Sequence, residues 1–186
     1  IIFNGEIFNY IELREELERL GHRFKTKTDT EVILNVYKAY GTSGFGKMNG
    51  MWAFAIVDLS KKKLILSRDR FSIKPLYYAA EKGTFLFSSE IKQLLPFQEK
   101  NSVNEQVLFA YLKQALIDAT PPETFFQGIW QLEPRHSLVM DLVTGERKEV
   151  PYWDFGQEQV PVKESEALLK FRELFWDSVR IRLRSD

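Results

Sequence analysis

No cysteine occurs among the 186 residues of this chain. That absence excludes disulfides, cysteine-based zinc or iron–sulfur sites and a thiolate nucleophile from these residues. The two histidines, His22 and His136, are a poor basis for a transition-metal site. We therefore predict no metal site here, and we expect the chemistry of the chain to depend on carboxylates, amides, hydroxyls or backbone groups.

An excess of charge of either sign is also lacking, since 26 Lys and Arg residues balance 26 Asp and Glu residues. Without net charge there is no general attraction for phosphate backbones or anionic lipid. The longest strongly apolar run, residues 51–57, is far below the roughly 20 residues of a membrane-spanning helix. We expect neither nucleic acid nor a membrane as a partner.

Glycine and proline are scarce, at 10 and 7 residues, whereas 44% of the residues are hydrophobic and 14% are aromatic. This composition is typical of a folded chain, because a disordered one lacks the apolar side chains that offset the entropy of ordering. The length suits one domain, or one domain and part of another. Because the chain begins at Ile1 without Met and stops inside a helical pattern near Asp186, we expect it to be an internal segment of a longer protein.

Helical periodicity marks four segments. The first three begin with the spacing of a capping box, in which a polar side chain is answered by a carboxylate three residues later. These pairs are Asn9 and Glu12, Thr28 and Glu31, and Ser102 and Glu105. We expect the three helices to end at Gly21, at Gly41 and near Leu116. The fourth segment has an apolar stripe over residues 168–183.

Short β-rich runs fill most of the remaining sequence. The first contains Asn4-Gly5, a dipeptide that favours the type I′ turn of a hairpin, so we predict two short strands around it. Runs at residues 51–58, 64–67, 76–80 and 84–88 predict an antiparallel meander, and runs at 137–141 and 147–152 predict another hairpin. Helices and strands in separate blocks indicate an α+β fold with antiparallel sheets. We place a domain boundary near residues 155–163.

Two pairs of residues are candidates for a functional site. The Asn4 side-chain amide and the Gly5 N–H are neutral donors that could converge on an oxyanion, and the Glu6 and Asp29 carboxylates could hold an ammonium group. Local sequence alone favours simpler interpretations, namely a hairpin turn at the first pair and stabilisation of a helix N-terminus by Asp29. For residues 68–74, which are dense in charge, we favour a buried ion-pair network.

Five segments, in the same order, resemble the glutaminase half of glutamine-hydrolysing asparagine synthetases. They are residues 3–10 (FNGEIFNY), 28–32 (TDTEV), 49–55 (NGMWAFA), 68–78 (RDRFSIKPLYY) and 87–92 (FSSEIK). The likeness continues through residues 151–154 (PYWD) and 179–186 (VRIRLRSD), so it covers essentially the whole chain.

This resemblance implies an N-terminal-nucleophile hydrolase-like four-layer sandwich, with antiparallel sheets between helix layers, that is incomplete at its N-terminus. Residues 1–155 would be the glutaminase domain without its first strands, and residues 156–186 the linker and first helix of an ATP-dependent synthetase domain. In such enzymes an N-terminal Cys attacks the glutamine side-chain amide. The released ammonia displaces AMP from ATP-activated aspartate, giving asparagine, AMP and pyrophosphate. ATP and magnesium would bind the downstream domain and none of these residues. The resemblance also implies a cytoplasmic protein, and homodimers are usual in the family.

Carried over onto this sequence, the resemblance assigns the Asn4 side chain and the Gly5 N–H to an oxyanion hole, and Glu6 and Asp29 to recognition of the α-amino group of glutamine. It therefore reverses the local preference at all four positions, and it leaves residues 68–74 with their structural interpretation. The nucleophilic Cys and the Arg that binds the glutamine carboxylate would precede Ile1, and an ATP-binding Ser-Gly-Gly-Leu-Asp-Ser loop would follow Asp186. The segment alone should be inactive.

Two departures from the family pattern are present. Phe8 replaces the commoner Tyr, and Ser72 stands where Gly is usual, so that turn must either avoid positive φ or bear strain. Three functions stay open for the whole protein: an asparagine synthetase, a related amidotransferase acting on a sugar, peptide or other carboxylate, or a non-hydrolysing scaffold that has lost the Cys. The acceptor pocket would lie downstream, so these residues do not separate the first two.

Overall fold

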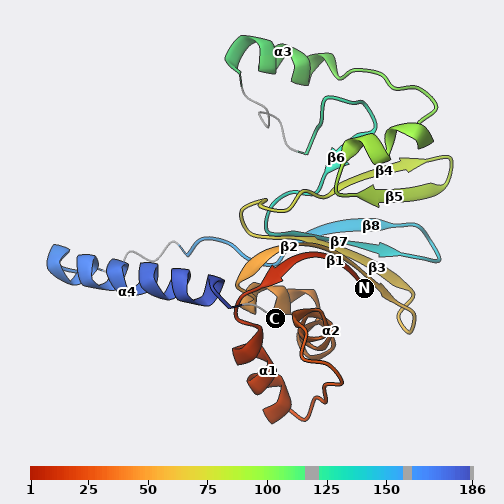
Figure 1. Ribbon diagram of the computed structural model, residues 1–186. Helices are drawn as coiled ribbons and strands as arrows, with labels where there is room; N and C mark the ends of the chain where they lie inside the picture. Colours follow the sequence, from red (N-terminus) through yellow and green to blue (C-terminus); the bar gives the residue numbers. More distant parts are fainter. Residues whose placement is uncertain (116–121, 157–160, 185–186) are drawn as a thin grey trace. The chain divides into compact units, whose positions relative to one another are not determined.

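Strands and helices occupy separate stretches of the chain (Figure 1). The computed structural model describes residues 1–115, 122–156 and 161–184. The predicted helix end near Leu116, part of the predicted boundary at 155–163, and the last two residues of the resemblance, Ser185 and Asp186, lie outside these ranges. The chain divides into two units, residues 1–5 with 51–152 and residues 6–50 with 153–186.

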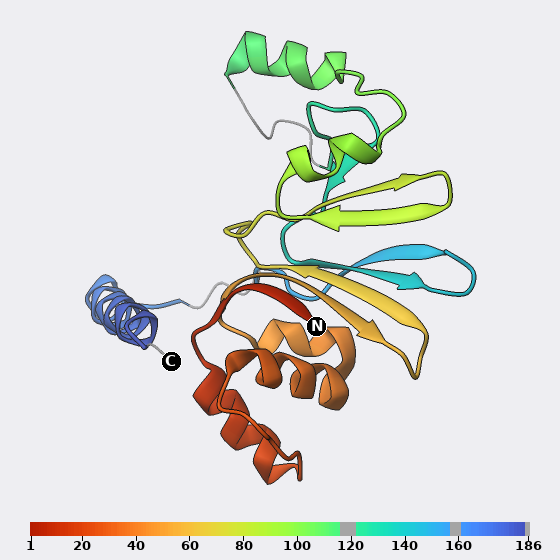
Figure 2. The same ribbon diagram turned by 45° about the vertical axis from the view of Figure 1, so that its right-hand side comes forward.

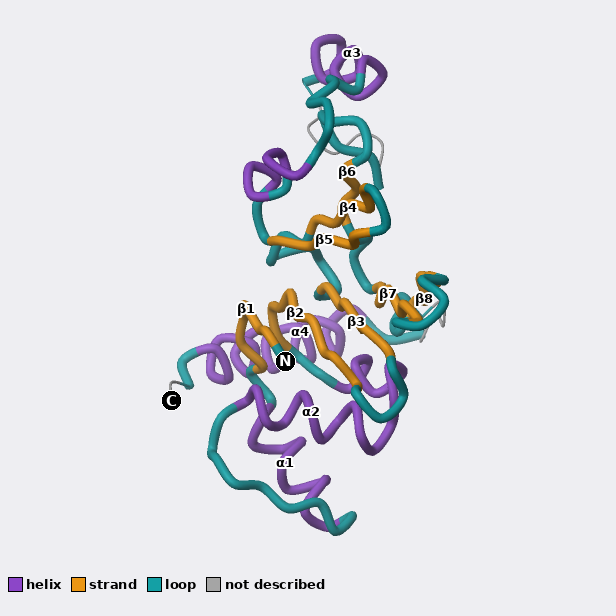
Figure 3. Tube along the Cα trace, turned by 90° about the vertical axis from the view of Figure 1, so that its right-hand side faces the viewer, coloured by secondary structure: helices purple, strands orange, loops and turns teal. Residues whose placement is uncertain are grey.

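The described strands form two sheets. The larger has the order β1-β2-β3-β7-β8, with β1 at Ile2–Ile7, β2 at Gly50–Asp58, β3 at Lys63–Arg68, β7 at His136–Asp141 and β8 at Arg147–Pro151. The smaller has the order β5-β4-β6, with β4 at Tyr77–Glu81, β5 at Thr84–Ser88 and β6 at Ile129–Gln131 (Figure 3). The pairs that join β2, β3, β7 and β8, and those that join β4 to β5 and β6, are antiparallel, which agrees with the predicted α+β class.

Two strand predictions need correction, and one short strand was missed. β1 is one continuous strand through Asn4 and Gly5, where a hairpin turn was predicted. The predicted meander divides between the sheets, since β2 and β3 belong to the larger sheet and β4 and β5 to the smaller. β6 was not predicted, because a strand of three residues is too short to show a period of two.

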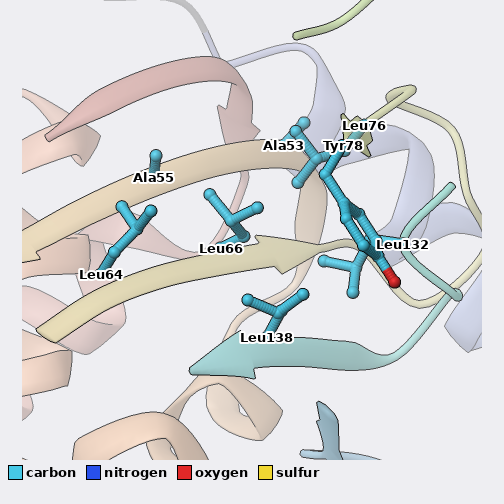
Figure 4. Packing of buried hydrophobic residues seen from close by; sticks show 8 residues of the cluster. All are labelled: Ala53, Ala55, Leu64, Leu66, Leu76, Tyr78, Leu132 and Leu138. Atoms are coloured by element: carbon cyan, nitrogen blue, oxygen red, sulfur yellow. The ribbon is translucent and has the colours of Figure 1, made fainter. Parts of the chain in front are cut away.

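A hydrophobic core joins the two sheets of the first unit (Figure 4). Alternate residues of a strand point to the same face, and Ala53 and Ala55 of β2 face the core together with Leu64 and Leu66 of β3. Tyr78 comes from β4 of the smaller sheet. The remaining members are Leu76, Leu132 and Leu138. The first unit also contains α3 (Glu105–Gln114).

Helices dominate the second unit. α1 (Tyr10–Arg19) and α2 (Asp29–Tyr40) lie side by side and lead into a 3₁₀ segment at Gly41–Lys47 (Figure 2). The Tyr40 hydroxyl donates to Glu16 Oε1 at 2.7 Å, and it links the two helices. α4 (Glu164–Arg182) is followed by Arg184, which donates to both carboxylate oxygens of Glu12 at 2.7 and 2.6 Å. Across the described part of the chain, each helix is too short or too polar to cross a membrane.

The predicted helices are confirmed, but their capping boxes are wrong. Asn9 uses its side-chain oxygen to accept the N–H of Asn49 at 2.8 Å, far from its own helix. Glu31 accepts the N–H of Thr26 at 2.6 Å, which precedes the predicted cap. The cap of α3 is Asn104, whose side chain accepts from the second and third N–H groups of that helix. Only at Asn9 is the new partner distant in the sequence; the partners of Glu31 and Asn104 are local but differ from the predicted ones.

Ser72 has φ of 58°, so the turn bears strain. A side chain in the left-handed region costs about 1–2 kcal/mol, part of which glycine offsets through its greater freedom in the unfolded chain. We expect Ser72→Gly to stabilise the first unit by about 0.5–1 kcal/mol, measured as a higher thermal unfolding midpoint. Ser72→Ala is the matched control because it retains the strained Cβ. A similar gain with alanine would assign the effect to the hydroxyl.

Candidate functional site

A cavity of about 340 Å³ lies within the first unit. Its walls come from both sheets, with apolar side chains of β2 and β5 and polar ones from β1 and from the segment after β5. The lining residues are Ile2, Asn4, Ala53, Phe54, Ala55, Leu76, Phe87, Ser88, Ser89 and Gln93. A concave, mostly apolar site with a few polar groups is typical of a small-molecule pocket.

The Asn4 amide is a polar group of this cavity. Its Nδ2 donates to Ser89 Oγ at 3.4 Å. Because an amide nitrogen carries two hydrogens, one more donor remains for a bound molecule. Ser89 was not singled out from the sequence: 85 residues separate it from Asn4, and its only local signal was a place just after a predicted strand.

Gly5 allows β1 to approach β2 without an intervening side chain. Its φ is 153°, and a Cβ built there would lie 2.0 Å from the Met51 carbonyl oxygen and 2.7 Å from Trp52 Cα. Trp52, whose Cα lies beside Gly5, is fixed by several contacts of its side chain. Trp52 is fully buried, its Nε1 donates to Ser67 Oγ at 3.2 Å, and its ring lies 5.7 Å from that of Tyr152. The Gly5 peptide therefore lies beside a residue whose side chain is buried and hydrogen-bonded.

Glu6 and Asp29 belong to the second unit. Asp29 is the first residue of α2 and only 7% exposed. Its Oδ2 accepts the N–H of Ile7 at 3.0 Å, and its Oδ1 accepts from the Thr30 hydroxyl at 3.4 Å. Ile7 directly follows Glu6, so folding brings Asp29 beside the strand that carries Glu6, a proximity that sequence spacing could not show.

Glu6 and Asp29 could bind a cation. A carboxylate offers about four acceptor positions, and the hydrogen bonds from Ile7 and Thr30 use two of those on Asp29. Burial lowers the local dielectric and strengthens attraction for an ammonium group. Asn4 and Gly5 differ in kind, because their donors are neutral and stabilise a developing negative charge.

Within the charged segment at residues 68–74, Arg68 and Asp69 are buried but Phe71 and Ile73 are exposed, so the predicted burial holds only in part. Hydrogen bonds to the backbone hold the two buried residues. Arg68 Nε donates to the Lys74 carbonyl at 2.9 Å, and Nη1 donates to the Leu132 carbonyl at 2.8 Å. Asp69 is fully buried and accepts N–H groups from Trp52 and from the turn that follows β3. These bonds join β2 and β3 to the turn at residues 71–74.

ATP and magnesium are expected to bind downstream of these residues. No group of three His, Asp or Glu side chains among the residues that the structure describes converges as metal ligands. In the sequence, Gly41, Gly44 and Gly46 lack the following Lys-Ser/Thr of a phosphate-binding loop.

Comparison with known proteins finds relatives that match the whole chain. Asparagine synthetase [glutamine-hydrolyzing] 1 of Bacillus subtilis is 36% identical over 186 residues, covering 100% of this chain and 29% of that protein. Amidase chry2 of Gibberella zeae is 32% identical over 191 residues, covering 100% of this chain and 27% of that protein. The chain thus spans less than a third of either relative.

A solved structure shares the fold. Glutamine phosphoribosylpyrophosphate amidotransferase from B. subtilis, complexed with ADP and GMP, superposes with a TM-score of 0.56 at 18% identity, covering 82% of this chain and 28% of that one. The family model for the glutamine amidotransferase domain matches residues 1–153. Since that match extends over most of the chain, the protein belongs to the glutamine amidotransferase domain family.

Proposed function

We propose that the whole protein hydrolyses glutamine to glutamate and ammonia and transfers the ammonia to ATP-activated aspartate, giving asparagine, AMP and pyrophosphate. The observation that carries this proposal is the Asn4 amide on the wall of a cavity, in a chain of the glutamine amidotransferase domain family. The identity to a glutamine-hydrolysing asparagine synthetase of B. subtilis supports aspartate as the acceptor.

In the proposed reaction, the thiolate of a Cys outside these 186 residues attacks Cδ of glutamine. The carbonyl oxygen becomes an oxyanion, to which Asn4 Nδ2 and the Gly5 N–H donate, while Glu6 and Asp29 bind the α-ammonium group. Collapse of the intermediate breaks the C–N bond, and the nitrogen leaves as ammonia after gaining a proton. Water then hydrolyses the thioester and yields glutamate. Neutral donors suit this role because they stabilise negative charge without adding a competing cation.

The same proposal covers the finer architecture. Residues 1–155 would form the glutaminase domain of a four-layer N-terminal-nucleophile sandwich, and residues 156–186 the linker and first helix of a synthetase domain that binds ATP and magnesium. The end of the family match at residue 153 supports this boundary. A homodimer would follow the usual state of the family.

The test uses the whole protein purified from its native source. Intact mass and N-terminal sequencing identify the first residue, and release of glutamate from glutamine measures hydrolysis. We expect an N-terminal Cys and a glutamine-dependent supply of ammonia. A mature protein without that Cys and without hydrolysis would contradict the proposal, and would leave the domain as a scaffold.

A second acceptor class has its own support. The 32% identity to an amidase of G. zeae extends over the full chain, as does the identity to the asparagine synthetase. The alternative is therefore an amidotransferase that acts on another carboxylate, such as a sugar, peptide or secondary metabolite. Formation of AMP or ADP in the presence of glutamine and a panel of carboxylates separates the two, since only the true acceptor stimulates it.

Asp29→Asn should weaken the use of glutamine by removing a charge partner of the ammonium group. A hydrogen bond to a charged group contributes about 1.5–3 kcal/mol, so we expect kcat/KM for glutamine to fall about 10- to 100-fold. The asparagine oxygen can still accept the Ile7 N–H, and ammonia-dependent synthesis should therefore persist. Steady-state kinetics with each nitrogen source measure the difference.

Glu31→Gln is the matched control, because it removes a carboxylate from the same first turn of α2. The hydrogen bond from the Thr26 hydroxyl, with those from the N–H groups of Lys25 and Thr26, lowers the pKa of Glu31 to about 2. Both variants therefore remove one negative charge at neutral pH from that helix N-terminus. Equal losses with glutamine and with ammonia in Asp29→Asn would indicate a folding role, and equal losses in the two variants would indicate an effect of charge alone.

A further inference from the structure

Asp69, directly after β3, has a carboxylate surrounded by backbone donors. Its Oδ2 accepts the N–H groups of Trp52 at 3.2 Å and Lys74 at 2.9 Å. Its Oδ1 accepts those of Phe71 and Ile73, each at 3.0 Å. Four donors match the roughly four acceptor positions of a carboxylate, which explains how a fully buried Asp is accommodated.

Asp69 holds Trp52 through both of its backbone groups. The Trp52 N–H donates to the carboxylate, and the Trp52 carbonyl accepts the N–H of Asp69 at 2.9 Å. The other three donors lie in the turn at residues 71–74. One side chain therefore fixes the position of β2 at Trp52 relative to the turn after β3.

Trp52 is also the residue against which Gly5 lies. The space for a Cβ on Gly5 is already filled by the Met51 carbonyl oxygen and by Trp52 Cα. With no side chain between them, the two backbones are in direct contact, and a shift of Trp52 Cα changes the position of the Gly5 peptide. The contacts run from Asp69 to Trp52 and from Trp52 to Gly5, all within the first unit.

We propose that Asp69 is a positioning residue for the oxyanion donor at Gly5. This inference rests on the proposed glutaminase function, and it goes beyond the purely structural role expected for residues 68–74. Asp69 touches neither substrate nor oxyanion; it acts through the backbone of Trp52. Since a misplacement of about 1 Å at a reacting centre can slow a reaction about 100-fold, the expected consequence is kinetic.

The experiment uses the whole protein and compares glutamine-dependent with ammonia-dependent synthesis. Asp69→Asn replaces an acceptor oxygen with an NH₂ group that faces N–H donors. Asp69→Glu keeps the charge but displaces the carboxylate by one methylene, and it serves if the first variant folds poorly. In both we expect kcat for glutamine to fall about 10- to 100-fold, with KM changed less than about threefold and the ammonia-dependent rate retained.

Ser67→Ala is the matched control. Ser67 is also fully buried and also bonded to Trp52, but through the indole Nε1 and not through the backbone. The Ser67→Ala variant should have a lower midpoint of thermal unfolding and an unchanged kcat for glutamine. A similar loss of kcat in Ser67→Ala would overturn the positioning role, because any destabilisation would then suffice.

Two further results would also overturn it. One is an unchanged kcat in Asp69→Asn; the other is loss of both glutamine- and ammonia-dependent activity in both Asp69 variants, which would assign Asp69 to folding. These failures concern variants of an active enzyme. Failure of the proposed function is distinct, because it is seen in the unaltered protein as an absence of glutamine hydrolysis, and the positioning role falls with it.

Discussion

Asn4→Ala is expected to slow glutamine hydrolysis by about 100- to 1,000-fold in kcat, the usual cost of removing one oxyanion donor. KM should change little, because an oxyanion donor acts mainly in the transition state. The side chain lines the cavity and is largely exposed, so its truncation should leave the fold intact. Steady-state kinetics of glutamate release from the whole protein measure both constants.

Ser89→Ala provides the control for Asn4→Ala. It removes the acceptor that orients the Asn4 amide but keeps the amide itself. We expect kcat to fall no more than about tenfold, in line with a neutral hydrogen bond of about 0.5–1.5 kcal/mol. A change confined to KM in Asn4→Ala would place the amide in ground-state binding and contradict its role in the oxyanion hole.

Gly5→Ala is expected to destabilise the first unit by about 3 kcal/mol or more, at the upper end of the costs of overpacking. The new Cβ would lie 2.0 Å from a backbone oxygen, and neither strand can relieve that contact by rotating a side chain. For a chain of this size the thermal midpoint should fall by about 6 °C or more. Calorimetry of the whole protein measures the transition of this domain.

Gly21→Ala is the control for the backbone conformation alone. Gly21 has φ of 90°, and the described residues leave the space around its missing Cβ open. The substitution should therefore cost only about 1–2 kcal/mol, the strain of a side chain at positive φ. If Gly5→Ala were no more harmful than Gly21→Ala, the close approach of β1 and β2 would not be a constraint.

Patterns with a regular period were predictable from the sequence, and long-range partners were not. The helices were found because their apolar residues recur at helical spacing, and most strands because their runs are β-rich. The capping box at Asn9 failed because local spacing cannot show that the Asn9 side chain accepts the N–H of Asn49. The box at Thr28 failed because Glu31 accepts from Lys25 and Thr26. At Asn4-Gly5 a turn preference was overruled by pairing with β2, for which the absence of a Cβ matters more than the turn.

Local sequence was also insufficient to identify the residues of the candidate site. Asn4, Gly5, Glu6 and Asp29 were named through a family resemblance, because local sequence favoured a turn and a helix N-terminus. The structure adds a cavity beside Asn4 and a hydrogen bond from Ile7 to Asp29. Ser89 could not be found, since its partner is 85 residues away and one serine after a strand carries little information.

In the turn at residues 71–74, the backbone is firmly held although side chains are exposed, a combination that is unusual in loops. Loop sequences ordinarily diverge among relatives because their backbones are loosely held. Here the backbone N–H groups are fixed by Asp69, while the side chain of Ile73 is 53% exposed. A substitution at Ile73 can therefore change the outer surface of this turn without disturbing β2, whereas a substitution at Asp69 removes contacts of both the turn and the strand.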